Sequence, residues 1–177
     1  IVVMTPKSLL RLPEAVSTLD DLVTGTFQRV IADASVDPAK VKRILLCTGK
    51  VYYDLVKRRR ESGREDVAII RVEQLYPFSN ALNDALAPFA DGTPLVWVQE
   101  EPKNMGARYF MNARLPEQIG RRLPLSLVAR VESASPATLV HKASVNGRNG
   151  GIRRLPVSTN TASHRTAPPI IRLPARE

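Results

Sequence analysis

Cysteine and histidine are scarce in this sequence, and their scarcity excludes several kinds of site. The 177 residues contain one cysteine, Cys47, and two histidines. A single thiol cannot build a disulfide framework or a multi-thiolate zinc site, and it suits a reducing compartment. We therefore expect a cytoplasmic protein without a metal centre.

Long apolar runs are missing as well. No run approaches the roughly 18 residues needed to cross a bilayer, and the N-terminus lacks the basic leader and apolar core of a secretory signal. These absences predict a protein with no membrane partner. The chain opens on Ile1 rather than methionine, and its short apolar run at residues 1–4 predicts a buried strand. A fragment of a longer protein would begin in this way.

The net charge of +9 is concentrated at one end of the chain. Residues 142–177 carry seven basic side chains and one acid, whereas residues 1–141 carry 19 basic and 16 acidic ones. Nucleic-acid binders usually carry a basic excess on a folded face, whereas here the excess belongs to the C-terminal extension. The alternative that the chain is a basic nucleic-acid-binding protein is therefore supported by its charge alone. The tail mixes glycine and proline without a sustained period, which predicts disorder. We therefore divide the chain into a domain at 1–141 and a basic disordered tail at 142–177, of the kind that an aberrant gene end would produce.

Apolar runs alternate with helical patterns through residues 1–141. Strands are predicted at 41–47, 67–72, 95–99 and 125–131, and helices at 17–23, at 51–60, after Ser79, and at 109–119 around Pro116. Strands separated by helices of about ten residues indicate βαβ units. The fold class is therefore α/β, with a mainly parallel sheet and helices on both faces. Such sheets place their working loops at the carboxyl ends of strands, here residues 48–50, 73–79 and 100–106.

Five motifs in register resemble a known family. They are residues 5–11 (TPKSLLR), 49–55 (GKVYYDL), 71–78 (RVEQLYPF), 97–107 (WVQEEPKNMGA) and 132–138 (ESASPAT). In this order they resemble the C-terminal domain of the thiamine-diphosphate-dependent decarboxylase component of 2-oxoglutarate dehydrogenase, over about residues 1–138. Two positions depart from the family pattern: Arg108 stands where an aromatic is usual, and after Thr138 the basic tail replaces a Gly-Ser sequence and a short helix.

The resemblance implies a transketolase C-terminal-like fold within an enzyme of the tricarboxylic acid cycle. The intact enzyme would decarboxylate 2-oxoglutarate on thiamine diphosphate with Mg²⁺ and pass succinyl to a dihydrolipoyl succinyltransferase complex. Implied partners are the remaining domains of the same enzyme and the second subunit of a homodimer. The family holds its cofactor through a Gly-Asp-Gly motif elsewhere, and residues 91–93 (DGT) lack the leading glycine. We therefore expect no catalytic, cofactor-binding or metal residue here, and no activity from the chain alone.

Two groups of residues are candidates for binding. Lys7 and Arg11 could contact an effector phosphate, because family members bind nucleotide or acetyl-CoA effectors near this region; a solvated basic face is the alternative. The segment that follows residues 95–99 combines carboxylates with aromatics, a composition typical of interfaces. Its candidate interface residues are Gln99, Glu100, Glu101, Asn104, Tyr109 and Phe110. General acid–base catalysis by the carboxylates is the other reading, but no histidine stands beside them.

Three further segments have ordinary structural interpretations. Residues 47–50 (CTGK) lack the earlier glycine and the following Ser/Thr of a phosphate loop. They indicate a strand-to-helix turn. The alternative that the chain is a free-standing nucleotide-binding module would need a glycine-rich loop, which the sequence lacks. Residues 57–60 (KRRR) are interpreted as an exposed helix end, where cations favour the dipole. Trp97, within an apolar strand, is expected in the core.

Overall fold

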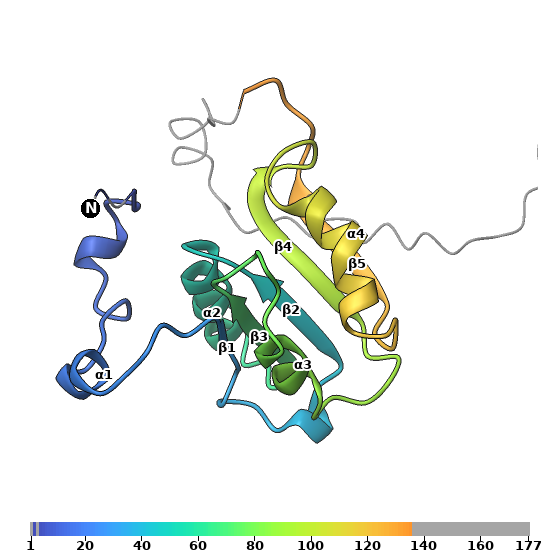
Figure 1. Ribbon diagram of the computed structural model, residues 1–177, viewed down its shortest axis with the longest axis horizontal. Helices are drawn as coiled ribbons and strands as arrows, with labels where there is room; N and C mark the ends of the chain where they lie inside the picture. The colour runs from blue at the N-terminus through green and yellow to red at the C-terminus, as the bar shows by residue number, and fades with distance from the viewer. Residues whose placement is uncertain (1, 3, 136–177) are drawn as a thin grey trace, which may run out of the picture. The chain divides into compact units, whose positions relative to one another are not determined.

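The computed structural model describes residue 2 and residues 4–135 (Figure 1). The predicted tail at 142–177 and its boundary at residue 141 lie outside these residues. In chain order the elements are 3₁₀ helix η1 (Leu9–Arg11), α1 (Leu19–Val23), β1 (Val30–Ile31), 3₁₀ helix η2 (Pro38–Lys40), β2 (Arg43–Cys47), α2 (Val51–Glu61), β3 (Val67–Val72), α3 (Ala81–Leu86), β4 (Leu95–Pro102), α4 (Arg108–Gln118) and β5 (Leu125–Arg130).

Five strands form one sheet in the order β1-β3-β2-β4-β5. Strands β3, β2, β4 and β5 run parallel, and only β1 pairs antiparallel, at the β3 edge. Leu45 of β2 is opposite Ile69 on one side and Val96 on the other, which makes β2 a central strand. The prediction of an α/β fold with a mainly parallel sheet is confirmed; the likeness to transketolase stays a prediction.

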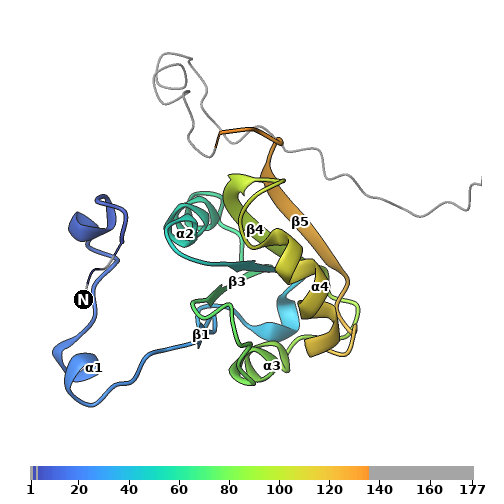
Figure 2. The same ribbon diagram turned by 45° about the horizontal axis from the view of Figure 1, so that its top comes forward.

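Helices cover both faces of the sheet, as predicted (Figure 2). Side chains alternate along a strand, so Val67 and Ile69 of β3 belong to the core beneath α2. Ile70 and Val72 of the same strand belong to the larger core that includes residues of α3 and α4. Trp97 lies in the larger core at 1% exposure, which confirms its expected place.

The N-terminal prediction was wrong. Val2 and Met4 are 89% and 91% exposed and belong to no strand, while residues 1 and 3 lie outside the described part. Strand β1 was missed because two residues are too short to show a period. Strand β4 runs to Pro102, three residues further than predicted, because β5 pairs with its polar end.

Lys57, Arg58 and Arg60 are exposed, as predicted for the end of α2, and Arg59 is the exception. Its guanidinium donates to the carboxylate of Asp33, and the two side chains are 12% and 7% exposed. Arg59 also donates to the backbone carbonyl of Val67 at 3.0 Å, and the N–H of Ile69 donates to Asp33 at 2.8 Å. This pair ties the segment after β1 to α2 and β3.

The described part holds neither a membrane-spanning helix nor a metal-binding cluster. Across residue 2 and residues 4–135, no helix is both long and apolar enough to cross a bilayer. In the same range, no three His, Cys, Asp or Glu side chains are placed to hold a metal ion. Cys47 is fully buried, and burial raises the pKa of its thiol to about 12. The thiolate is the reactive form, so Cys47 is inert at neutral pH.

Candidate functional site

The carboxyl edge of the sheet contains a topological switch point between β2 and β4. The chain leaves β2 for β3 on one side, and β4 lies on the other. Open α/β sheets commonly bind ligands in this position. Here Lys50, just after β2, places its Nζ 3.0 Å from Oε1 of Glu100 near the end of β4. The hydrogen bond to Glu100 raises the pKa of the Lys50 ammonium above its ordinary value. An ion pair therefore spans the switch point.

A second charged pair stands beside it, at the end of β3. The guanidinium of Arg71 lies 4.8 Å from the ring centroid of Tyr52 and 5.7 Å from that of Tyr53, distances suited to cation–π attraction. Its Nε is 2.9 Å from a carboxylate oxygen of Glu73. Burial acts to lower the pKa of Arg71, but the hydrogen bond and charge attraction of Glu73, together with the neighbouring Tyr53 and Tyr52, outweigh burial and raise the pKa. Lys50 and Arg71 are thus each already paired with a carboxylate at this edge.

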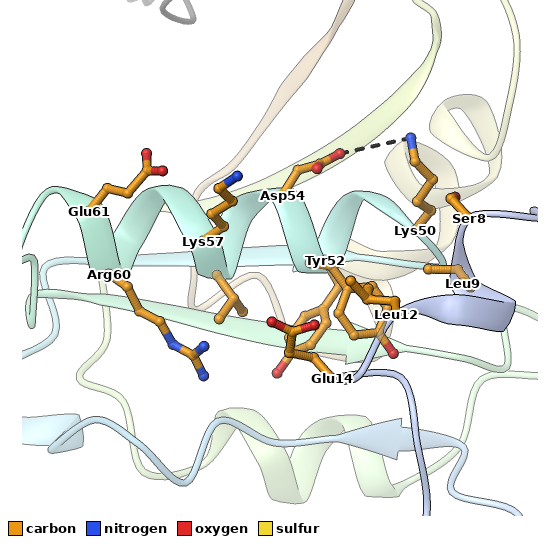
Figure 3. A pocket seen from close by; sticks show the side chains of 12 residues that line it. Ser8, Leu9, Leu12, Glu14, Lys50, Tyr52, Asp54, Lys57, Arg60 and Glu61 are labelled. Atoms are coloured by element: carbon orange, nitrogen blue, oxygen red, sulfur yellow. Dashed lines mark ion pairs between the residues drawn. The ribbon is translucent and has the colours of Figure 1, made fainter.

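A hollow of about 620 Å³ lies along α2 (Figure 3). Residues from the N-terminal segment form one wall and residues from α2 form the other. Three cations and three acids are among its lining residues, which are Ser8, Leu9, Leu12, Glu14, Lys50, Tyr52, Tyr53, Asp54, Val56, Lys57, Arg60 and Glu61. The lining therefore has no net charge of its own.

The predicted effector residues border this hollow without lining it. Lys7 and Arg11 are exposed and adjoin the lining residues Ser8 and Leu12 in the chain. Sequence analysis missed Lys57 and Arg60, because the amphipathic pattern of α2 assigns its charged side to solvent. Nothing in the local sequence predicts that residues 8–14 approach α2. The i, i+3 spacing of these two cations after Tyr52 and Tyr53 is the only hint.

Gln99 holds the loop between β4 and α4 from inside. The residue is 6% exposed, and its Oε1 accepts a hydrogen bond of 3.0 Å from Nε1 of Trp97. Its Nε2 donates to the carbonyls of Pro102 at 3.1 Å and Met105 at 2.7 Å. Gly106 has φ +69°, which disfavours a side chain, and a Cβ there would be crowded, at 3.1 Å from this amide. Gln99 can therefore contribute to the predicted interface only indirectly, by positioning this loop.

The other predicted interface residues occupy different places. Glu100 is engaged by Lys50, Glu101 is exposed, and Asn104 exchanges hydrogen bonds of 3.0 and 3.1 Å with the backbone of Ser133. Tyr109 and Phe110 lie on α4, within the helix predicted at 109–119. The neighbouring Met111 is fully buried in the larger core.

We call Tyr76, Tyr109 and Phe110 the aromatic surface. Tyr76 is 77% exposed and Tyr109 is 59% exposed. The ring of Phe110 lies 6.1 Å from that of Tyr76 and 5.2 Å from that of Phe78, so it links the β3–α3 turn to α4. The guanidinium of Arg108 lies 5.0 Å from the ring centroid of Tyr109 and donates to the carbonyl of Lys103 at 3.0 Å. Exposed aromatics beside arginine are typical of protein interfaces.

Residues 16–149 match the family model described as 2-oxoglutarate dehydrogenase C-terminal. The chain belongs to this family. The 2-oxoglutarate dehydrogenase E1 component of Haemophilus influenzae is 50% identical over 139 residues, which cover 77% of this chain and 15% of that protein. The E1 component of Azotobacter vinelandii is 47% identical over 142 residues, with the same coverage. The 2-oxoglutarate dehydrogenase-like mitochondrial protein of Rattus norvegicus is 47% identical over 143 residues, covering 78% of this chain and 14% of the rat protein.

These matches confirm the resemblance drawn from the motifs. The chain spans about 15% of the length of the bacterial relatives that it matches. The family match also runs beyond Thr138, where the motifs end, to residue 149. Residues 49–55 turn from β2 into α2, residues 71–78 end β3, and residues 97–107 end β4 and form the loop that Gln99 holds. Ser133, from the fifth motif, binds Asn104 in that loop. Four of the five motifs thus meet at the carboxyl edge.

The described residues of the 2-oxoglutarate dehydrogenase C-terminal domain do not fit a thiamine diphosphate site. Residues 91–93 lie ahead of β4, at the opposite edge of the sheet, and Asp91 is paired with Arg122 at 2.9 Å. A Mg²⁺ site needs several oxygen ligands, and residue 2 and residues 4–135 offer no group of three acidic, histidine or cysteine side chains. We therefore derive no chemical step at this cofactor. The expectation that the whole chain binds none stays a prediction.

Proposed function

We propose that this chain is the C-terminal scaffold domain of a 2-oxoglutarate dehydrogenase E1 component, and that its aromatic surface contacts the remaining domains or the second subunit of a homodimer. The observation that carries the proposal is that four family motifs meet at one edge, where Tyr76 of the motif at 71–78 is exposed and Tyr109, two residues beyond the motif at 97–107, is exposed as well. An exposed aromatic patch on a rigidly held loop and helix is suited to protein contact.

The intact enzyme would decarboxylate 2-oxoglutarate on thiamine diphosphate and Mg²⁺ bound by its other domains, and would pass succinyl to a dihydrolipoyl succinyltransferase complex. This chain would supply structure and surface to that reaction without a cofactor ligand. A single buried thiol suits a reducing compartment, and we propose the cytoplasm. The names of the E1 relatives support this enzyme context.

Changing Tyr76 and Tyr109 together to Ser is expected to weaken self-association of the purified chain, because the uncovered aromatic surface lacks its natural partner. Light scattering across a concentration series at roughly 1 M salt, where the Debye length falls to about 3 Å, removes the contribution of the basic tail. Phe110 is left in place because it packs on Phe78. Leu10→Ser, at a residue 73% exposed, is the control and should change nothing. A wild-type chain that stays monomeric at high concentration would contradict this role.

A second role, binding of an anionic effector, is favoured by the hollow along α2. Its lining is neutral overall, but Lys7 and Arg11 at its border add two positive charges. Tyr52 and Tyr53 offer ring faces or edges to a planar group, and their own rings meet edge to face at 5.2 Å. A phosphate-bearing ligand with a planar heterocycle would use both features.

The double change Lys7→Gln and Arg11→Gln is expected to weaken binding of acetyl-CoA or a nucleoside monophosphate by roughly tenfold or more, since it removes two charge-assisted contacts. Calorimetric titration measures this. The matched control, Lys40→Gln with Arg114→Gln, removes the same charge from exposed side chains that neither line the hollow nor adjoin a lining residue in the chain. Equal weakening in both double variants would indicate nonspecific attraction, and the effector role would then be rejected.

A further inference from the structure

Exposed apolar side chains are concentrated ahead of the sheet. Among the described residues, eleven large apolar side chains are strongly exposed, and eight of them lie at or before residue 27. Residues 16–27, which we call the arm, hold five of these: Val16, Leu19, Leu22, Val23 and Phe27, at 69–80% exposure. Scattered apolar residues on a surface are normal, but a contiguous apolar segment marks a contact site.

The arm contains a helix that is too short to be stable alone. Helix α1 has five residues, none of them buried. Isolated helices below roughly 12–15 residues are marginal in water. A capping box begins α1: the Oγ1 of Thr18 accepts from the N–H of Asp21 at 3.1 Å, and the Asp21 carboxylate accepts from the N–H of Thr18 at 2.9 Å. Such a cap contributes only about 1 kcal/mol. The remaining stabilisation has to come from a partner.

The spacing of the apolar residues indicates how that partner binds. Leu19, Leu22 and Val23 are at positions i, i+3 and i+4 and therefore share one side of α1. This is the anchor pattern of a helix that lies in an apolar groove. Asp20 and Asp21 fall between the anchors, so the rim of the groove is expected to be basic. Both faces of the sheet are already covered by helices of the described part, one face by α2 and the other by α3 and α4.

We infer that the arm docks into an apolar, basic-rimmed groove on the part of the E1 polypeptide that precedes this domain. The comparisons identify the partner that would carry this groove. The family is described as C-terminal, and the chain spans 15% of the length of its bacterial relatives, so most of their length precedes the matching region. In the chain the arm, with α1, precedes β1 (Figure 1), on the side of the sequence where that larger part lies in the relatives. This inference rests on the proposed function, and it adds a second contact, separate from the aromatic surface.

The test mixes the full 177-residue chain with the Haemophilus influenzae E1 component shortened to end before the region that this chain matches. Calorimetry measures affinity, and hydrogen exchange reports protection of residues 16–27. Leu19→Ser with Leu22→Ser should weaken binding about a hundredfold, because each buried leucine contributes at least tenfold. Val131→Ser, at a residue 87% exposed outside the arm, should leave the affinity unchanged. Neither leucine is buried, so circular dichroism should show both variants folded.

The outcomes separate the two proposals. Failure of the unchanged chain to bind the shortened relative would overturn the scaffold role and the arm contact together. Binding that is equally tight in the double leucine variant, with residues 16–27 still exchanging freely, would overturn the arm contact alone. Self-association of the chain that is lost in the leucine variant, without any effect on the shortened relative, would assign the arm to a second copy and reject the inference.

Discussion

Replacing Asp33 with Ala is expected to lower the free energy of unfolding by about 3–5 kcal/mol, the usual cost of breaking one side of a buried ion pair. The change leaves the guanidinium of Arg59, only 12% exposed, without its carboxylate. It also removes the acceptor for the N–H of Ile69 in β3. Denaturant unfolding monitored by the fluorescence of Trp97 measures the loss. Since Trp97 lies in the core, its signal follows global unfolding.

The same pair gives the stability a defined dependence on pH. Burial acts to raise the pKa of Asp33, but hydrogen bonds from Arg59 and three further donors outweigh it, and the pKa lies below the ordinary value. A carboxyl with a depressed pKa stabilises the fold above its unfolded pKa of about 3.9. That contribution is lost as the pH falls through the folded pKa. Below about pH 4 the wild type should therefore lose stability more steeply than Asp33→Ala.

Glu117→Ala is the matched control for the Asp33 experiment. Glu117 pairs with Arg114 at 3.7 Å, and both side chains are more than 60% exposed. Exposed pairs contribute about 0–1 kcal/mol, so this variant should unfold almost as the wild type does. If Asp33→Ala also cost less than about 1 kcal/mol, the pair would not be the structural tie that joins the segment after β1 to α2.

Much of the fold could be read from the sequence where a segment carries its own pattern. Strand β3 has its predicted ends, 67–72, because it is an apolar run bounded by polar residues. Helix α2 likewise shows its period over eleven residues. By contrast, β1 has two residues and no pattern, and the polar end of β4 is a strand only because β5 pairs with it.

The candidate site was harder to derive, because its geometry depends on distant partners. Asp33 and Arg59 are 26 positions apart, and nothing local marks either as buried. Gln99 was grouped with Glu100 and Glu101 by proximity in sequence. The two-residue period of a strand would have placed it on the same side as Trp97, facing inward. Within the aromatic surface, the ring of Tyr76 in the β3–α3 turn meets that of Phe110 on α4, a contact between residues 34 positions apart that no local pattern predicts.

A chimaera should show that this chain can stand in for the C-terminal domain of an E1 enzyme. In the Haemophilus influenzae E1 component, the matched region of 139 residues would be replaced by the corresponding residues of this chain. With half of the residues identical, the chimaera should retain decarboxylation within about tenfold of the parent rate, a difference of roughly 1.4 kcal/mol in barrier. Deletion of the region should abolish activity, because the remaining domains lose their scaffold contacts.

The decisive measurement is CO₂ release from 2-oxoglutarate with thiamine diphosphate and Mg²⁺, by this chain alone, by the shortened relative and by the chimaera. A scaffold domain without cofactor ligands predicts release by the chimaera only. Turnover or stoichiometric thiamine diphosphate binding by the chain alone would contradict that role, as would full activity of the shortened relative.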